Sequence, residues 1–269
     1  MSSIRLSLIQ TQLHWENITK NITHFEQLID QIDQSDLILL PETFSTAFSM
    51  NSKSIAEPMS GEAVSWLINM ASATNTAIGG SIIIEEEGKI FNRFVLAKAD
   101  GQIHTYDKRH LFRMGDEDRH FSQGERLLDF NLKGWKIRPQ ICYDLRFPVW
   151  SRNKFHALTE GCITADYDLL IYVANWPEVR VSAWQKLLFA RAIENQAYVA
   201  AVNRIGEDGN GVNCSGSSMI IDYKGEIIWQ AKEEREIIQT VTLEREPLNT
   251  FRQKFPVGLD ADEFTIGTK

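Results

Sequence analysis

The sequence has few cysteines and fewer positive charges than negative ones. The three cysteines, Cys142, Cys162 and Cys214, are too few and too scattered for a disulfide framework, which favours a reducing cytoplasm as the location of the protein. The formal net charge is −8. Nucleic acid and anionic membranes require clustered Lys and Arg in a partner, so we expect neither of them to bind this protein.

Long hydrophobic runs and metal-binding patterns are also missing. The longest apolar stretches, such as residues 168–174, have the length of strands and are too short to span a bilayer, and the start of the chain does not resemble a signal peptide. The six histidines show no HExxH pairing and the cysteines show no CxxC pairing. The Gly-rich segment 206–211 precedes a strand pattern rather than a helix, which argues against a dinucleotide-binding loop. We therefore expect no metal and no cofactor.

Strand and helix patterns alternate along the chain. Apolar residues at helical spacing predict helices over residues 17–33, 64–71 and 182–196, and short apolar runs predict strands over residues 4–10, 36–40, 77–84, 135–142, 168–174 and 197–203. Such alternation favours an α/β layered fold, and the order of elements is similar in the two halves. The tail from Glu246 is expected to be mostly irregular. No linker or shift in composition interrupts the chain, so we expect one domain over residues 1–269.

Three reactive side chains stand directly after predicted strands: Glu42, Lys108 and Cys142. Ligands of α/β sheets bind at the carboxyl ends of strands, so the three side chains could share one crevice. Together they form a workable set for acyl transfer, with Cys142 as nucleophile and Glu42 as general base and acid. Lys108 and the backbone N–H of Tyr143 would stabilise the oxyanion. Taken singly, each has a structural alternative: a buried core thiol, a solvated loop carboxylate and an exposed basic turn.

Four sequence blocks resemble the signatures of the carbon–nitrogen hydrolase (nitrilase) superfamily, in the order of that family. They cover residues 39–44, 106–112, 141–148 and 173–177, reading LLPETF, YDKRHLF, ICYDLRFP and VANWP. The resemblance implies a four-layer α-β-β-α sandwich and a catalytic triad of Glu42, Lys108 and Cys142. It also implies a second glutamate, for which Glu117 stands at about the matching distance and Asp116 and Asp118 are the alternatives. Members commonly form homodimers, so a homodimer is expected here.

Within the superfamily the likeness is strongest to omega-amidases. It rests on residues 107–112 and 142–148 and on the ending at 254–256 and 260–264. This branch hydrolyses the terminal amide of a small 2-oxo dicarboxylate monoamide, such as 2-oxoglutaramate or 2-oxosuccinamate, through a thioester on the cysteine. N-carbamoyl amidohydrolases and deaminated-glutathione amidases use the same triad and are alternatives. More distant alternatives are a Cys-His hydrolase with His110 or His120 as base, and a non-enzymatic binding protein of the same fold.

A substrate that carries a carboxylate should meet a cation. Arg146 is the candidate because a guanidinium binds a carboxylate bidentately, and an ion pair with Asp144 is its structural alternative. Four aromatic residues that follow catalytic strands are candidates for the wall of the pocket, with packing as the alternative role: Phe44, Phe48, Tyr143 and Trp176. The segment 154–165 is longer than the resemblance leads us to expect, and it would affect substrate preference if it borders the pocket.

Overall fold

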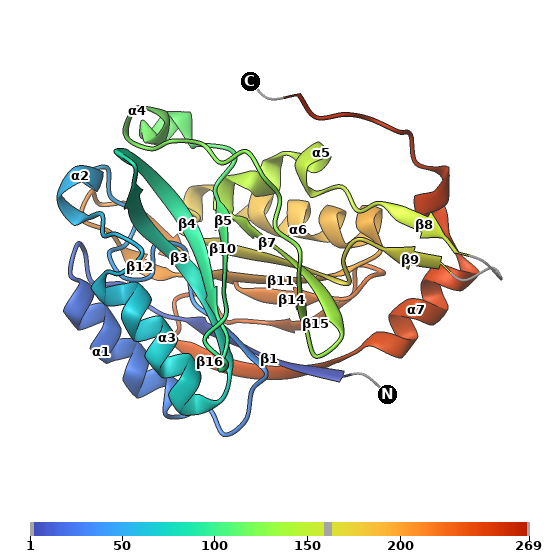
Figure 1. Ribbon diagram of the computed structural model, residues 1–269, viewed down its shortest axis with the longest axis horizontal. Helices are drawn as coiled ribbons and strands as arrows, with labels where there is room; N and C mark the ends of the chain where they lie inside the picture. The colour runs from blue at the N-terminus through green and yellow to red at the C-terminus, as the bar shows by residue number, and fades with distance from the viewer. Residues whose placement is uncertain (1–2, 159–162, 268–269) are drawn as a thin grey trace.

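The computed structural model describes residues 3–158 and 163–267, and within them two six-stranded sheets pack face to face (Figure 1). The first sheet runs in the order β16 (Ile237–Glu244), β1 (Ser3–Gln10), β2 (Leu37–Leu39), β3 (Ala77–Glu86), β4 (Lys89–Ala97) and β5 (Ile103–Asp107). The second runs in the order β15 (Ile227–Gln230), β14 (Met219–Ile221), β11 (Tyr198–Asn203), β10 (Leu169–Ala174), β7 (Trp135–Ile141) and β6 (Phe130–Leu132).

Both sheets repeat one series of strand pairings. In the first sheet β16–β1 is antiparallel, β1–β2 and β2–β3 are parallel, and β3–β4 and β4–β5 are antiparallel. Counted from β6, the second sheet has the same series, with β7–β10 and β10–β11 as its parallel pairs. The similar element order that the sequence predicts for the two halves is therefore present in the topology.

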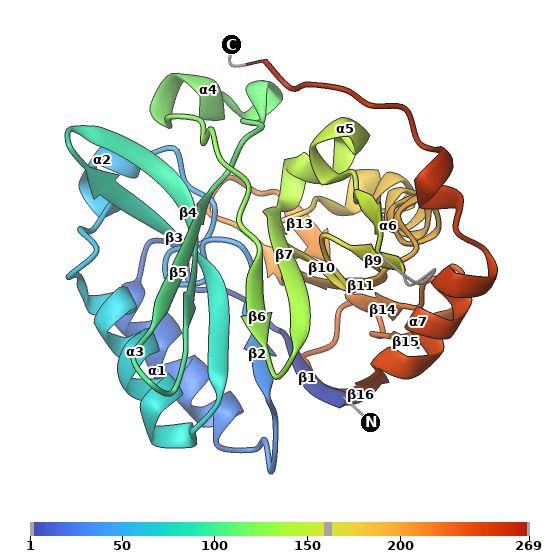
Figure 2. The same cartoon turned by 45° about the vertical axis from the view of Figure 1, so that its right-hand side comes forward.

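Helices cover the outer faces of the two sheets. The helices α1 (Ile18–Ile29) and α3 (Glu62–Thr74) lie beside the first sheet, and α6 (Val181–Asn195) and α7 (Arg245–Lys254) lie on the side of the second (Figure 2). The shorter elements are α2 (Ser52–Ile55), η1 (Arg113–Gly115), α4 (Glu117–His120), η2 (Cys142–Arg146), α5 (Pro148–Ser151), η4 (Glu178–Arg180) and η5 (Val257–Asp260). The order helix, sheet, sheet, helix confirms the predicted four-layer sandwich.

Alternation along the strands explains how the layers pack. Ile38 and Leu39 are neighbours on β2, yet Ile38 packs in the cluster with Phe25 of α1 and Leu67 of α3, whereas Leu39 packs between the two sheets with residues such as Trp135. Successive side chains of a strand point to opposite faces, so a central strand in this fold is apolar on both sides. Burial of each such side chain contributes about 1.5–3 kcal/mol.

The end of the chain differs from the prediction. The sequence predicts an irregular tail from Glu246, but residues 245–254 form α7. Pro247 obscures the helical pattern, yet it lies in the first turn, where a proline removes no internal hydrogen bond. Leu248 and Arg252, four residues apart on one face, are the buried residues of this helix. The prediction was therefore wrong for α7.

The described residues of the segment 154–165 lie away from the catalytic end. Its described residues form the two-stranded ribbon of β8 (Phe155–Ala157) and β9 (Ile163–Ala165), and residues 159–162 lie outside the described part. The ring of Phe155 packs under the guanidinium of Arg252 at 5.4 Å, next to α7. A search of the described helices for one long and apolar enough to cross a membrane finds none.

Arg252 joins α7 to the second sheet, and its loss should destabilise the protein. The side chain is 2% exposed and donates to the Asp168 carboxylate and to the carbonyls of Tyr167 and Gln196, each at 2.8 Å. We predict that Arg252→Met lowers the free energy of unfolding by about 3–5 kcal/mol, because Asp168 is left as a buried, unpaired charge.

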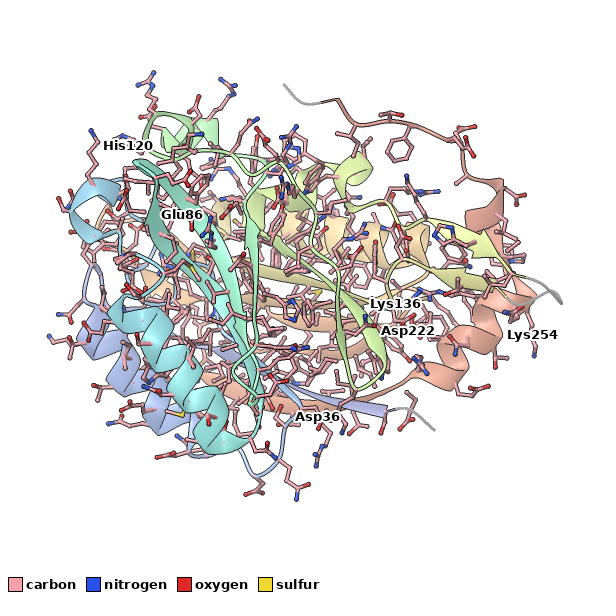
Figure 3. All side chains as sticks on the ribbon, in the orientation of Figure 1. Asp36, Glu86, His120, Lys136, Asp222 and Lys254 are labelled. Atoms are coloured by element: carbon pink, nitrogen blue, oxygen red, sulfur yellow. The ribbon has the colours of Figure 1, made fainter. Side chains whose placement is uncertain are left out.

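The control is Lys254→Met, since Lys254 is exposed at the end of the same helix and points outward (Figure 3). Denaturant unfolding of both variants measures the difference. Equal stabilities of the two variants would show that Arg252 does not anchor α7.

Candidate active site

The carboxyl ends of several strands bring the predicted catalytic residues together. Glu42 follows β2, Lys108 follows β5 and Cys142 follows β7, while Asn175 follows β10. Because β5 is antiparallel to β4, and β4 to β3, β5 runs in the same direction as β2 and ends at the same edge. The site therefore draws Glu42 and Lys108 from one sheet and Cys142 and Asn175 from the other.

Lys108 lies between two carboxylates in the interior. Its Nζ is 2.8 Å from Oε1 of Glu42 and 2.9 Å from both carboxylate oxygens of Glu117. All three side chains are at most 1% exposed. Burial alone would lower the pKa of Lys108, but the carboxylates of Glu117 and Glu42 raise it well above its usual value. Lys108 is therefore a fixed ammonium.

Of the three acids that are candidates for the second glutamate, Glu117 is the one whose carboxylate contacts Lys108. Its carboxylate also accepts the backbone N–H of Phe112 at 2.6 Å, while Asp116 and Asp118 are bonded to the exposed side chains of Arg119 and Arg113. Burial raises the pKa of Glu117, and the ammonium of Lys108 opposes that rise. The structure thus distinguishes among the three acids that the sequence left open.

Two asparagines that sequence reasoning did not assign complete the support of Glu42. Asn92 Nδ2 donates to Oε1 of Glu42 at 2.8 Å, and the backbone N–H of Asn175 donates to Oε2 at 2.8 Å. The amide of Asn175 also donates to the backbone carbonyl of Glu42 at 2.6 Å. Asn92 is fully buried on β4, in the apolar sequence KIFNRFVLA, and this buried amide is the signal that could have identified it.

Cys142 occupies a strained position at the start of η2. Its φ is 42°, in the left-handed region that residues other than glycine rarely adopt, at a cost of about 1–3 kcal/mol. Burial raises the pKa of its thiol well above the usual value, the Glu42 carboxylate raises it further, and Lys108 opposes the rise. At neutral pH Cys142 is therefore a neutral thiol with a carboxylate base beside it, rather than a preformed thiolate.

These residues border a cavity of about 240 Å³. Among its lining residues are Glu42, Lys108, Cys142, Tyr143, Arg146 and Trp176. It is smaller than the roughly 300–1,000 Å³ of pockets for drug-sized ligands, so it suits a small substrate. Cys214 also lines it, and burial raises the pKa of the Cys214 thiol to about 12, whereas Cys162 lies outside the described residues.

The predicted substrate-binding residues fall into two groups. Arg146 lines the cavity with its guanidinium 4.9 Å from the centre of the Trp176 ring, and Tyr143 lines the cavity beside Phe112, with 5.2 Å between the ring centres. The expectation for Phe44 is corrected, because this side chain is not among the lining residues. It is fully buried among the helices over the first sheet, with its ring centre 5.6 Å from that of Phe25.

The structure also shows where the residues of the alternative roles lie. Asp144 is not bonded to Arg146, because its carboxylate accepts from Tyr106 Oη at 2.7 Å and from the backbone N–H of His110 at 2.9 Å. His110 stacks on the ring of Phe147, with 3.7 Å between ring centres, and His120 is exposed on α4, at the end of the molecule where Glu86 also lies (Figure 3). Neither histidine borders the cavity, so neither is placed to act as the base.

Two further questions about the site concern the segment 154–165 and a possible metal ion. Residues 154–158 and 163–165 do not border the catalytic cavity, so these residues do not contact a substrate there. Among the residues 3–158 and 163–267, no group of three or more His, Cys, Asp or Glu side chains is arranged to hold a metal ion.

The fold and this set of side chains define a hydrolase of amide carbon–nitrogen bonds. The chain belongs to the carbon–nitrogen hydrolase family, whose profile matches residues 5–253. It is 45% identical over 266 residues to Omega-amidase YafV of Yersinia enterocolitica, covering 99% of this chain and 100% of that relative. It is 33% identical to the 2-oxoglutaramate amidase of Bacillus subtilis, covering 87% and 88% of the two chains.

A solved structure is similar over the same length. The CN-hydrolase superfamily protein XC1258 of Xanthomonas campestris, which carries an arsenic adduct in its active site, superimposes with a TM-score of 0.95. The two sequences are 42% identical, and the match covers 99% of this chain and 100% of that one. The fold described above is therefore the fold of this superfamily.

Glu117 should be necessary for turnover although it is remote from solvent. In Glu117→Gln the charge of Lys108 is shared with Glu42 alone, which makes Glu42 a weaker base. We predict that kcat falls by about 100-fold or more, within the range that a positioned acid or base contributes. Ammonia release under saturating substrate measures it.

The matched control is Asp118→Asn, since Asp118 pairs only with the exposed Arg113. Exposed ion pairs contribute little, so this variant should keep its kcat within about twofold. If Glu117→Gln turns over as fast as the control, the buried carboxylate is not part of the machinery.

Proposed function

We propose that this protein is an omega-amidase that hydrolyses the terminal amide of a small 2-oxo dicarboxylate monoamide. 2-Oxoglutaramate and 2-oxosuccinamate are substrates of this class, and the products are the 2-oxo dicarboxylate and ammonia. The observation that carries the proposal is one small cavity with a thiol–carboxylate–ammonium set at one end and an unpaired guanidinium, Arg146, in its wall. The names of the relatives at 45% and 33% identity support the same reaction.

Acylation begins with the neutral thiol of Cys142. Glu42 accepts the thiol proton while Sγ attacks the amide carbon, so no free thiolate has to form in the buried site. The oxyanion that develops lies against the ammonium of Lys108 and the backbone N–H of Tyr143. When the carbon–nitrogen bond breaks, Glu42 returns its proton to the nitrogen, and ammonia leaves a thioester on Cys142.

Deacylation uses the same groups in the same roles. Glu42 takes a proton from a water molecule, which attacks the thioester carbon, and the oxyanion again lies against Lys108. The carbon–sulfur bond then breaks and the proton returns from Glu42 to Sγ. Because Lys108, Asn92 and the N–H of Asn175 hold Glu42 in place, one carboxylate serves both half-reactions without reorganisation.

Arg146 is the proposed partner of the substrate carboxylate. It lies in the cavity wall, and within residues 3–158 and 163–267 no carboxylate is within ion-pair distance of its guanidinium. Tyr143 and Trp176 would wall the substrate, with Trp176 fixing the guanidinium from below through its ring face. A carboxylate bound there bidentately would orient the far end of the chain toward Cys142.

The size of the cavity also favours some of the alternative functions over others. A deaminated-glutathione amide is a tripeptide-sized molecule, which a cavity of about 240 Å³ does not enclose. An N-carbamoyl amino acid is small enough and carries a carboxylate, so it remains the second candidate. A binding protein without activity is disfavoured because Glu42, Lys108, Glu117 and Cys142 are all present and in contact or lining one cavity.

We further propose a cytoplasmic homodimer built on one domain spanning residues 1–269. Free thiols at Cys142 and Cys214 suit a reducing compartment. Exposed apolar side chains on the side of the second sheet, such as Val149 at 55% and Ile193 at 54% exposure, supply surface for a second copy. Light scattering of the purified protein tests this, since a monomer at all concentrations would contradict it.

Removal of the nucleophile should abolish turnover and keep the fold. We predict that Cys142→Ala lowers ammonia release from 2-oxoglutaramate by about 10⁴-fold or more, as expected for the loss of a covalent nucleophile. The variant should melt within a few degrees of the parent, because alanine fills nearly the same space. A few percent of residual activity, with contamination excluded, would overturn the assignment of Cys142.

The same assay, run on a panel, tests the substrate class. The panel compares 2-oxoglutaramate, 2-oxosuccinamate, glutamine, asparagine and an N-carbamoyl amino acid. The proposed function predicts the highest kcat/KM for one of the two 2-oxo amides. Preference for the N-carbamoyl compound would instead make the protein an N-carbamoyl amidohydrolase.

Arg146 should matter only for substrates with a carboxylate. We predict that Arg146→Ala raises KM for 2-oxoglutaramate by about 30-fold or more, consistent with the loss of a buried charge-assisted pair, and changes KM for the neutral pentanamide by less than about threefold. Steady-state kinetics on both amides measure the two ratios. Equal changes for both amides would remove the recognition role of Arg146.

A further inference from the structure

A second arginine, Arg180, lines the same cavity and takes no part in the reaction as described above. It ends η4, which follows the Asn175–Trp176 turn after β10. The indole N–H of Trp176 donates to the backbone carbonyl of Arg180 at 2.8 Å, and the ring of Trp176 lies under the guanidinium of Arg146. Trp176 thus contacts both arginines, the guanidinium of Arg146 through its ring face and the backbone of Arg180 through its edge.

The charges that line the cavity leave these two arginines in excess. Lys108 is neutralised by Glu42 and Glu117, and Arg204 donates to the carbonyls of Gly206 and Val212 beside Asp208. In the described part of the chain, Arg146 and Arg180 have no carboxylate within ion-pair distance. A 2-oxo dicarboxylate monoamide offers one carboxylate, which engages one guanidinium and leaves the other to be accounted for.

The side chain of Arg180 is held only loosely. Its guanidinium lies 5.6 Å from the centre of the Phe112 ring, and its Nη2 donates to the sulfur of Met114 at 2.9 Å. A thioether is a weak acceptor, and the side chain of Met114 is 77% exposed. A carbonyl oxygen of a substrate would replace this sulfur with a better acceptor.

The acids of the cavity are already occupied. Glu42 is bonded to Lys108, Asn92 and Asn175, and the Asp208 carboxylate accepts the backbone N–H groups of Asn210 and Val212. Among the described lining residues no other carboxylate is present to receive a substrate ammonium. An amino group on the carbon next to the substrate carboxylate would therefore meet a cation and find no partner.

We propose that Arg180 discriminates between substituents at C2 of the substrate by donating a hydrogen bond to the 2-oxo oxygen, while Arg146 binds the adjacent carboxylate. This inference rests on the proposed function and extends it to the choice between 2-oxo and 2-amino acids. A ketone oxygen accepts from Arg180, whereas the ammonium of glutamine or asparagine is repelled by it. Carboxylate and ketone are on adjacent carbons, so two guanidinium groups in one small cavity can hold both.

Three substrates of one length separate this role from simple charge attraction. 2-Oxoglutaramate, glutaramate and glutamine share the carboxylate and the terminal amide and differ only at C2, which carries an oxygen, two hydrogens or an ammonium. We expect Arg180→Met to lower kcat/KM for 2-oxoglutaramate by about 10-fold or more. In the same variant, kcat/KM for glutaramate should stay within about threefold of the wild-type value, and kcat/KM for glutamine should rise by about threefold or more. The matched variant Arg146→Met should lower all three by a similar factor.

A conservative variant, Arg180→Lys, completes the set. Arg180→Lys keeps the charge and should still reject glutamine, which a merely structural role would not predict. Equal losses for all three substrates in Arg180→Met, or unchanged kcat/KM for 2-oxoglutaramate, would overturn the role of Arg180 while leaving the proposed function intact. A wild-type protein that releases no ammonia from either 2-oxoglutaramate or 2-oxosuccinamate would contradict the proposed function, and this inference with it.

Discussion

A single buried ammonium, that of Lys108, contacts two carboxylates and so controls the charge of the catalytic end. Burial of three charges is costly unless each is paired and hydrogen-bonded, and here Asn92, the N–H of Asn175 and the N–H of Phe112 supply the remaining donors. The donors come from both sheets. The site therefore exists only when the sheets are packed face to face, which makes the sandwich a condition of the chemistry rather than a mere support for it.

The arrangement also fixes the form of the nucleophile. Two carboxylates and one ammonium leave an excess of negative charge beside Cys142, and the thiol is nearly buried, so its pKa is raised. A low-pKa thiolate would be formed by an excess of positive charge beside the sulfur, whereas the charged groups that act on this thiol are one ammonium, Lys108, and two carboxylates, Glu42 and Glu117. Transfer of the proton to Glu42 and formation of the carbon–sulfur bond then occur together. The left-handed backbone at Cys142 presents the sulfur at the start of η2, and the first N–H groups of a helix lack partners within the helix.

Much of this arrangement could be predicted from the sequence, for physical reasons that also explain the failures. Glu42, Lys108 and Cys142 could be proposed because each directly follows a predicted strand and lies in a sequence block that resembles the family signatures, whereas position alone left a structural alternative open for each. Phe44 could not be placed, because Thr43 adopts a φ of 43° and redirects the chain into the helical layer. The unpaired state of Arg180 depends on which acids in distant segments are already bonded, and no local pattern records that.

The reaction path depends on resting Cys142 being a neutral thiol beside the carboxyl group of Glu42. The most direct measurement is the difference in ultraviolet thiolate absorbance between the wild-type protein and Cys142→Ser as a function of pH. A neutral Cys142 should give no thiolate signal at about pH 7, and any signal should rise only above about pH 8.5, the usual pKa of a cysteine thiol. A thiolate signal that is already full at neutral pH and disappears in acid would contradict it.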